Sequence, residues 1–217
     1  MNADVTRERL LCSALEIFST QGYEGASTRD VCAAAGIGNA SIHYHFGDKA
    51  ALYRELFVRL LDEFEQRMRG CGMDRLSGRE ALLAYYQAQL RPLAENPELA
   101  RQVYLYLREE FQPSGLVDDL LPRGMELQME LLGALLRREL GVSKLDASLQ
   151  RLMTTLLGAS TVYVVKRRSI TAAMPGLMEG AHWLNRIAAH LADAGWTLIE
   201  AERQKRSAKA TTAAATA

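Results

Sequence analysis

The sequence predicts an all-α protein in which a three-helix N-terminal module precedes a larger helical domain. Apolar residues recur with the helical period along almost the whole chain of 217 residues, and no segment alternates between apolar and polar residues as a strand does. Breaks at Gly22, Gly36 and Asn96–Pro97 separate the periodic stretches. Each stretch is then of helical length, so we expect helices only.

The first elements are defined by an apolar stripe and by capping residues. Four residues at i, i+3, i+4 and i+7 share one face of a first helix: Leu11, Ala14, Leu15 and Phe18. Gly22 is expected to end this helix, because glycine tolerates the left-handed conformation of a helix C-cap. Two short helices should follow, over about 28–36 with Ser27–Thr28 as its N-cap and over about 39–46 with Asn39 as its N-cap.

Longer helices fill the rest of the chain. Asp48 can cap a helix that runs to about Arg69. Further helices are expected at 77–94, 97–112, 122–140, 145–168 and 173–203. The end of the chain is rich in Ala and Thr and is expected to be disordered. The predicted division is a first domain over 1–69, a second over 70–205 and a disordered tail over 206–217.

Composition and charge narrow the class of protein. The chain has 26 Lys and Arg residues against 26 Asp and Glu residues, which excludes a globally basic nucleic-acid coat and a highly acidic disordered chain. The uncharged run 152–165 is shorter than the roughly 20 residues that a membrane helix needs, and no secretion signal is expected at the N-terminus. Three cysteines without a CxxC pair suit a reducing compartment, so we expect a cytoplasmic protein without a membrane partner.

Residues 28–46 have the pattern of a helix-turn-helix. Two short helices are joined by Gly36-Ile37-Gly38, which permits a sharp turn around one apolar plug. Val31 and Ala35 lie four apart and face inward from the first helix, and Ile42 and Phe46 do the same from the second. The outer faces keep polar, aromatic and short side chains, which suit close approach to a DNA major groove.

The segment STRDVCAAAGIGNASIHYHFGDKAALYRELF, residues 27–57, resembles the DNA-binding region of TetR-type transcriptional regulators. The shared features are Gly22-Tyr23 at the end of the first helix, the run from Thr28 to Ile37, and the spacing of four later residues: Tyr44, Phe46, Lys49 and Leu52. The resemblance implies a homodimeric repressor that binds a palindromic double-stranded DNA operator. It also implies a C-terminal domain for dimerisation and for a small-molecule effector that lowers DNA affinity.

The candidate DNA-binding residues lie on and around the predicted helix-turn-helix. Phosphate contacts are expected from Thr28, Tyr44, His45 and Lys49, and base-edge contacts from Asn39, Ser41 and His43. Arg29, Gly38 and Ala40 complete the set. Tyr44 could instead cover the edge of the module, and Lys49 could be a solvated lysine. His43 and His45 point to different sides of a helix, so no metal pair is expected.

The balance of charge in the first domain counts against a simple electrostatic account of DNA binding. Residues 1–69 contain eight Lys and Arg residues against ten Asp and Glu residues, so no basic stripe is present. DNA contacts must then depend on a few placed cations, hydroxyls and helix N-termini.

The second domain holds the candidate effector and dimer sites. Side chains with polar tips or adaptable thioethers are the candidate ligand-binding residues: Tyr85, Tyr104, Arg108, Met125 and Met129. Arg108 would suit a carboxylate or phosphate, and a structural pair with Glu109, Glu110 or Glu130 is an equal alternative. Ordinary core packing is as good an interpretation of the methionines. The helices expected at 145–168 and 173–203 have broad apolar faces and are the predicted dimer interface.

Other classes of function fit the sequence less well. A Gly-rich phosphate loop, a nucleophile elbow and an HExxH motif are all missing from the sequence, so we expect neither an enzyme nor a bound cofactor or metal. Two alternatives stay open. One is a helical small-molecule-binding protein without a DNA function, which the acidic first domain motivates. The other is a regulator that senses redox state through Cys12, Cys32 or Cys71.

Overall fold

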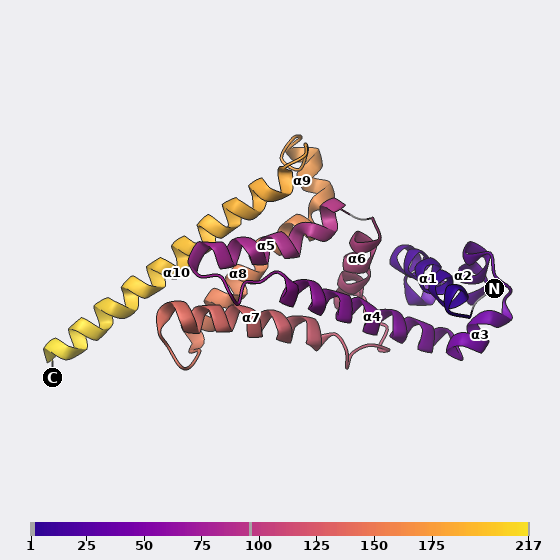
Figure 1. The fold of residues 1–217 in the computed structure, drawn as a ribbon, viewed down its shortest axis with the longest axis horizontal. Helices are drawn as coiled ribbons and strands as arrows, with labels where there is room; N and C mark the ends of the chain where they lie inside the picture. Colours follow the sequence, from indigo (N-terminus) through magenta and orange to yellow (C-terminus); the bar gives the residue numbers. More distant parts are fainter. Residues whose placement is uncertain (1–2, 96, 217) are drawn as a thin grey trace. The chain divides into compact units, whose positions relative to one another are not determined.

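The computed structural model describes residues 3–95 and 97–216, in which ten α-helices and no strand occur (Figure 1). The prediction of an all-α fold is therefore confirmed. In chain order the helices are α1 (Ala3–Gly25), α2 (Thr28–Ala35), α3 (Ala40–Phe46), α4 (Lys49–Gly70), α5 (Gly78–Glu95), α6 (Pro97–Phe111), α7 (Pro122–Leu140), α8 (Ala147–Val165), α9 (Arg167–Ala173) and α10 (Trp183–Thr216). Asn96, part of an expected break, lies outside the described residues.

The chain folds into two compact units. The first unit takes in Met1–Gln66 and Glu95–Met125, and the second takes in Arg67–Ala94 and Glu126–Ala217. The first domain was expected to end at residue 69, close to this boundary, but α6 was expected in the second domain and instead packs with α1. The hydrophobic period shows which face of a helix is buried and does not show which partner buries it.

The core of the first unit forms around α1. The four residues of the predicted stripe, Leu11, Ala14, Leu15 and Phe18, are all buried, which confirms the first helix. α4 contributes two aromatic side chains that are fully buried, Tyr53 and Phe57, and α6 contributes Leu105. Together these residues make one continuous apolar cluster that supports α2 and α3.

Local capping signals account for most of the boundaries in the first unit. Gly22 has φ 75° and ψ 176°, so it breaks α1 as expected, although one more turn follows it to Gly25. Ser27 accepts a backbone N–H from the first turn of α2, and Gly36 ends that helix in the left-handed conformation with φ 63°. The expected Asn39 cap is wrong, because its backbone is already helical and its side chain makes no capping hydrogen bond.

The second unit is built from α5, α7, α8 and α10. Fully or almost fully buried side chains from all four helices form its core: Leu82, Tyr86, Leu132, Leu136, Leu149, Leu156, Ile187 and Ile199. Gly195 of α10 is buried, and a Cβ placed there would lie 2.9 Å from Leu156 Cδ2 and 3.1 Å from Leu82 Cδ1. The absence of a side chain at residue 195 therefore lets α10 approach α5 and α8 closely.

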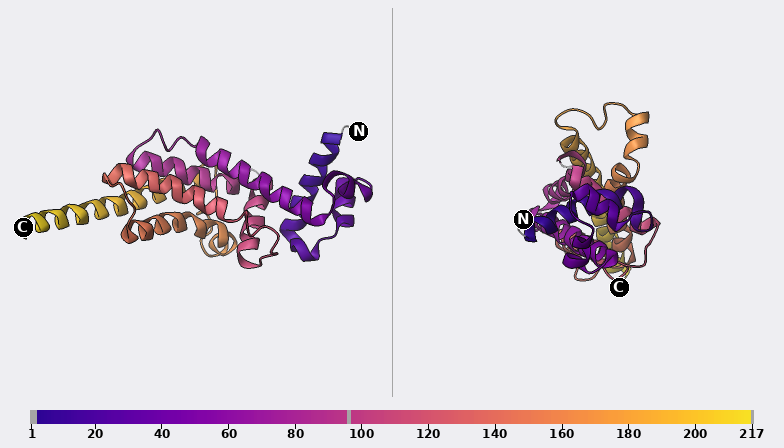
Figure 2. Two further views of the ribbon diagram at one scale, coloured as in Figure 1. Left: turned by 90° about the horizontal axis from the view of Figure 1, so that it is seen from below. Right: turned by 90° about the vertical axis from the view of Figure 1, so that its right-hand side faces the viewer.

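The C-terminal part differs from the prediction in two ways. The helix expected over 173–203 is wrong, because α9 ends at Ala173 and α10 begins only at Trp183. Pro175 and Gly176, the latter with φ 88°, lie in the intervening loop and are the breaking signals that the periodicity obscured. The expected disorder over 206–217 is also wrong, because α10 runs as a single helix to Thr216 (Figure 2); Ala217 lies outside the described residues.

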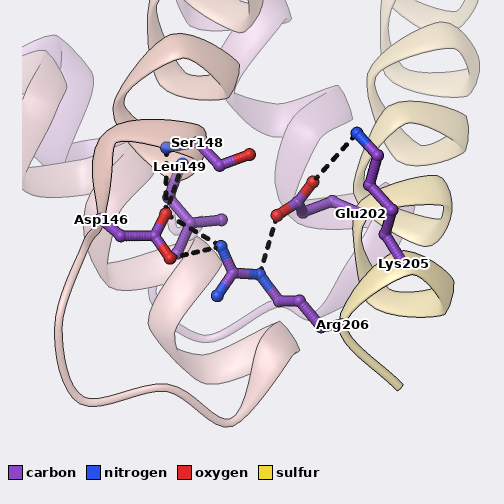
Figure 3. Close-up of polar contacts among 6 residues, drawn as sticks. All are labelled: Asp146, Ser148, Leu149, Glu202, Lys205 and Arg206. Atoms are coloured by element: carbon purple, nitrogen blue, oxygen red, sulfur yellow. Dashed lines mark hydrogen bonds and ion pairs between the residues drawn. The ribbon is translucent and has the colours of Figure 1, made fainter. Parts of the chain in front are cut away.

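A cluster of polar contacts joins α10 to the start of α8 near the predicted end of the second domain (Figure 3). Asp146 is the N-cap of α8, where its Oδ1 accepts the backbone N–H groups of Ser148 and Leu149 at 3.0 and 3.1 Å. Arg206 of α10 donates to both oxygens of the same carboxylate, at 2.9 and 2.8 Å, and its Nε donates to Glu202 at 2.8 Å. Arg206, ten residues before the end of α10, thereby joins this helix to the start of α8.

The described residues offer neither a membrane-spanning helix nor a metal-binding cluster. None of the helices in residues 3–95 and 97–216 has the length and apolar character that crossing a bilayer requires. The same part of the chain holds no group of three or more His, Cys, Asp or Glu side chains that could bind a metal ion.

Candidate DNA-binding surface

α3 has one buried face and one open face. Ile42 is 2% exposed, and Phe46, one turn later, is partly buried against the same core. Tyr44 lies on the other side of the helix and is 81% exposed. The expected inward face of this helix is thus confirmed, and the Tyr44 side chain lies largely in solvent, with its ring edge to face against His45 at 4.9 Å between the ring centres.

The predicted DNA-binding residues are spread over the start of α2, the turn before α3, α3 itself and the start of α4. Six of them are exposed: Arg29, Gly38, Asn39, Ala40, His43 and Tyr44. Four are partly buried: Thr28, Ser41, His45 and Lys49. All ten belong to the first unit and keep some accessible surface. Their contacts with DNA stay a prediction.

His43 is oriented by the backbone at the end of α3. Its Nδ1 forms a hydrogen bond with the carbonyl oxygen of Gly47. Because a carbonyl can only accept, Nδ1 carries the proton in this hydrogen bond, and Nε2 is left for another partner, as an acceptor when the ring is neutral. An acceptor on this face can pair with the exocyclic amino group of cytosine or adenine in a major groove.

The arginines of the first unit are largely engaged by its own carboxylates. Arg54 pairs with Asp119 at 2.7 Å, and Arg59 pairs with Glu63 at 2.9 Å and also with Glu8. Each of these ion pairs neutralises an arginine together with a carboxylate, so these arginines are not free to contact DNA and the net charge of the unit is unchanged.

Arg29 and Lys49, two cationic residues near α3, differ from these arginines in their partners. Within residues 3–95 and 97–216, the structure gives neither Arg29 nor Lys49 an ion pair with a carboxylate. Arg29 is exposed in the first turn of α2, and the Nζ atom of Lys49 lies 4.1 Å from the centre of the Tyr23 ring. Their positive charges stay available to an anionic partner.

The predicted effector residues are distributed over both units. Tyr85 and Met129 belong to the second unit, and Tyr104, Arg108 and Met125 belong to the first. Tyr85 is fully buried, and its hydroxyl donates to Gln128 Oε1 at 3.2 Å and accepts from Gln89 Nε2 at 3.1 Å. Burial raises the pKa of this hydroxyl, which stays protonated.

The three candidate effector residues of the first unit are less buried than Tyr85 or have backbone partners. Tyr104 is 40% exposed and Met125 is 46% exposed. Arg108 donates to the carbonyl oxygens of Thr20 and Gln21 at 3.4 and 3.3 Å, which is neither of the two expected roles. The first unit has a shallow groove of about 490 Å³, and none of the effector candidates lines it. Its lining residues are Asp4, Val5, Glu8, Arg9, Cys12, Ser13, Ala34 and Ala35.

A buried carboxylate on α6 was not predicted. Glu109 is 2% exposed, accepts a hydrogen bond from the Tyr53 hydroxyl, and accepts the Ser114 backbone N–H at 2.9 Å. The only signal in the sequence was its position, one turn after Leu105 on the buried face of α6. A charged residue at a core position is expected to have a specific partner, but the pattern does not show which.

The three cysteines are poor candidates for a thiol sensor. Burial raises the pKa of the Cys32 and Cys71 thiols, and partial burial together with the Glu98 carboxylate raises the pKa of the Cys12 thiol. A raised pKa leaves less of the thiolate that oxidants attack. This argues against the redox-sensing alternative.

Two family models match the chain. The model "Bacterial regulatory proteins, tetR family" matches residues 10–56, which include α2 and α3. The model "HTH-type transcriptional dual regulator CecR, C-terminal domain" matches residues 78–201, more than half of the chain. The chain belongs to the TetR family of bacterial transcriptional regulators. Within this family, its C-terminal part is of the CecR type.

Curated relatives of this TetR-family chain are similar mainly over the N-terminal region. AcrR of Shigella flexneri is 38% identical over 55 residues, which are 25% of this chain and 26% of AcrR. UidR of Escherichia coli K12 is 33% identical over 72 residues, 31% of this chain and 37% of UidR. YezE of Bacillus subtilis is 29% identical over 108 residues. The chain spans from 26% to 53% of the length of these relatives.

Solved structures of similar proteins share the fold over nearly the whole chain. A candidate transcriptional regulator from Pseudomonas aeruginosa PAO1 has a TM-score of 0.70 at 20% identity, with 95% of each chain covered. The fatty acid degradation regulator FadR from Bacillus halodurans has a TM-score of 0.63 at 18% identity, with 87% of this chain and 97% of that chain covered. At these identities the likeness establishes the fold of the TetR-family chain and not its ligands.

Proposed function

We propose that this TetR-family protein is a ligand-responsive repressor that binds a palindromic double-stranded DNA operator as a homodimer. The observation that carries the proposal is the open face of α3, where Tyr44 is 81% exposed on the side opposite the buried Ile42. Such a face is what a recognition helix offers to a major groove. The relatives support the same activity, since each is named as a transcriptional regulator. IcaR of Staphylococcus aureus strain Newman is named as a negative one.

The proposed contacts are divided between phosphates and base edges as the sequence predicts. Lys49, Tyr44, His45 and Thr28 contact phosphates, and they fix the position of the protein on the duplex. Asn39, Ser41 and His43 face base edges and determine sequence preference. Arg29, Gly38 and Ala40 border the same surface.

The homodimer is proposed to form through α8, α9 and α10 of the second unit. Large apolar side chains are left exposed on these helices and on the loop after α9: Val162, Val165, Met174, Leu177 and Leu198. Exposed apolar side chains gathered on one group of elements mark a surface that another protein covers. A second copy of the chain supplies a matching surface by symmetry.

The effector is proposed to be a small molecule that favours one of two arrangements of the dimer. It weakens DNA binding by its differential affinity for that arrangement alone. Tyr85, Tyr104, Arg108, Met125 and Met129 stay the candidate effector residues. The protein works where its DNA lies, in the cytoplasm, and it needs no cofactor or catalytic step.

A fluorescence-anisotropy titration tests the proposal. The full-length protein is added to a labelled duplex from the region upstream of its own gene, and to a scrambled duplex of the same composition. We expect tighter binding to the upstream duplex, with two chains bound per site. If the protein binds the upstream duplex no more tightly than the scrambled duplex, the alternative of a helical small-molecule-binding protein without a DNA function is favoured.

A further inference from the structure

The Lys49 side chain is held by an aromatic ring. Its Nζ atom lies 4.1 Å from the centre of the Tyr23 ring, within the range of a cation–π interaction. Lys49 is the first residue of α4, whereas Tyr23 follows the break in α1. A lysine side chain otherwise has considerable rotamer freedom, so this contact restricts where the ammonium can lie.

The Tyr23 ring is in turn fixed by the core of the first unit. Its centre lies 6.2 Å from that of Phe18, in a stacked arrangement, and 5.1 Å from that of Tyr53. Phe18 and Tyr53 are both fully buried and contact each other edge to face at 4.9 Å. The three rings form one aromatic cluster, with Tyr23 as its outer member.

Two neighbouring residues of α6, Glu109 and Arg108, contact residues that position the Tyr23 ring. Glu109 accepts a hydrogen bond from the hydroxyl of Tyr53. Arg108 lies against Gly22, the residue before Tyr23, so closely that a Cβ on Gly22 would be 2.6 Å from Arg108 Nε. Gly22 has φ 75°, a conformation that glycine adopts without strain and that sends the chain into Tyr23. The last turn of α6 therefore determines where the Tyr23 ring stands.

We propose that Tyr23 is a positioning residue for the contact of Lys49 with a DNA phosphate, and that Arg108 and Glu109 fix Tyr23 for this task. The inference rests on the proposed phosphate contact of Lys49. An ammonium that is already held near its bound position loses less conformational entropy when the phosphate arrives. Tyr23 itself does not touch DNA in this account.

A double-mutant cycle on Tyr23 and Lys49 tests the inference. Full-length variants are titrated into a random-sequence duplex and into the upstream duplex at several salt concentrations. Tyr23→Leu, which removes the ring, should weaken binding by about two- to fivefold per subunit. Tyr23→Phe, which keeps the ring, should bind as the wild type does. In the Lys49→Ala background, Tyr23→Leu should have no further effect on affinity, whereas a purely structural role would reduce affinity equally in both backgrounds.

A second pair of variants tests the contribution of α6. Arg108→Ala should weaken DNA binding of the wild type and leave that of Lys49→Ala unchanged. Arg101→Ala is the matched control, because Arg101 is on the same helix and pairs with Glu16 of α1 at 3.8 Å without touching Gly22 or Tyr23. It should leave DNA affinity unchanged. Circular dichroism and thermal melting of every variant confirm that it is folded.

The outcomes separate the inference from the proposed function. If Lys49→Ala alone leaves affinity and salt dependence unchanged, the proposed phosphate contact fails, and the inference fails with it. If Lys49→Ala weakens binding but Tyr23→Leu does not, or if Tyr23→Leu is equally harmful in both backgrounds, only the positioning role is overturned. If Tyr23→Leu does not fold, the Arg108→Ala cycle decides by the same criterion.

Discussion

Asp146 has two tasks, and they can be separated by substitution. It caps α8 and accepts two hydrogen bonds from Arg206 (Figure 3). Asparagine at residue 146 could still cap the helix, because its side-chain oxygen accepts backbone N–H groups equally well, but it would lose the ion pair. Alanine would lose both. Thermal melting should therefore rank the wild type above Asp146→Asn, and Asp146→Asn above Asp146→Ala.

The same carboxylate predicts a dependence of stability on pH. The hydrogen bonds from Arg206, followed by that from the Leu149 N–H, lower the pKa of Asp146 below its ordinary value. The stabilisation is thus present above the unfolded pKa of about 3.9 and is lost as pH falls through the folded pKa. The difference in unfolding free energy between wild type and Asp146→Asn should shrink below about pH 4. Asp118→Asn is the control, because it removes an exposed carboxylate for which the described residues provide no ion pair, and it should show no such trend.

Arg108 is a residue whose contacts could not be predicted from its chemistry alone. Its chemistry suggested an effector carboxylate, and the structure places it on carbonyl groups of Thr20 and Gln21, 88 and 87 residues away in the chain. Such a partner leaves no trace in local spacing. The two roles predict different results for Arg108→Ala, since an effector role leaves ligand-free DNA binding intact and a positioning role weakens it.

At the scale of elements, the helices were predicted most accurately where strong local sequence signals define them. The caps at Ser27 and Gly36 and the apolar stripe of α1 are local features, and the structure confirms them. The break between α9 and α10 was missed, because apolar residues continue with the helical period through Pro175 and Gly176. The helical end of α10 was missed because the Ala- and Thr-rich composition after residue 206 was interpreted as a sign of disorder, although alanine also has the highest helix propensity.

The close approach of α10 to α5 and α8 predicts the effect of adding one methyl group. Gly195→Ala would place a Cβ 2.9 Å from Leu156 Cδ2, and overpacking of this kind costs about 1–3 kcal/mol. The gain from replacing glycine by alanine in a helix is smaller, at about 0.5–1 kcal/mol. We therefore expect a net loss of stability in chemical denaturation.

Gly70→Ala is the control for that experiment. Gly70 is the last residue of α4, and a Cβ there would meet no other atom within 4 Å. The control should lose no stability. A stability of Gly195→Ala equal to or above that of the wild type would show that Leu156 and Leu82 make room at no cost.

At the scale of the whole molecule, the boundary of the units differs most from the prediction. α6 was assigned to the C-terminal domain by its place in the chain, and it packs instead with α1 in the first unit. The contact between Tyr53 and Glu109 joins residues 56 positions apart. Which helices pack together is determined by such distant contacts, and the period of apolar residues does not contain this information.

The proposed homodimer can be tested on exposed residues of the second unit. Val165 and Leu198 are 41% and 43% exposed, so Val165→Glu and Leu198→Glu should leave the fold intact and shift the protein towards monomer in sedimentation velocity. Leu156, at first sight part of the same apolar surface, is 1% exposed and belongs to the core. Val58→Glu is the control, on α4 of the first unit with 37% exposure. Unchanged sedimentation of both test variants would place the interface elsewhere.

The central claim is that a surface around α3 binds DNA with separate phosphate and base contacts. The most direct test compares Lys49→Ala with Asn39→Ala in titrations of operator and scrambled duplexes at several salt concentrations. Lys49→Ala should weaken binding to both duplexes alike and reduce the salt slope by about one unit per subunit. Asn39→Ala should keep the slope and lose preference at one base position per half-site, a discrimination of roughly 1–3 kcal/mol. The account is contradicted if Lys49→Ala changes base preference while the salt slope stays the same.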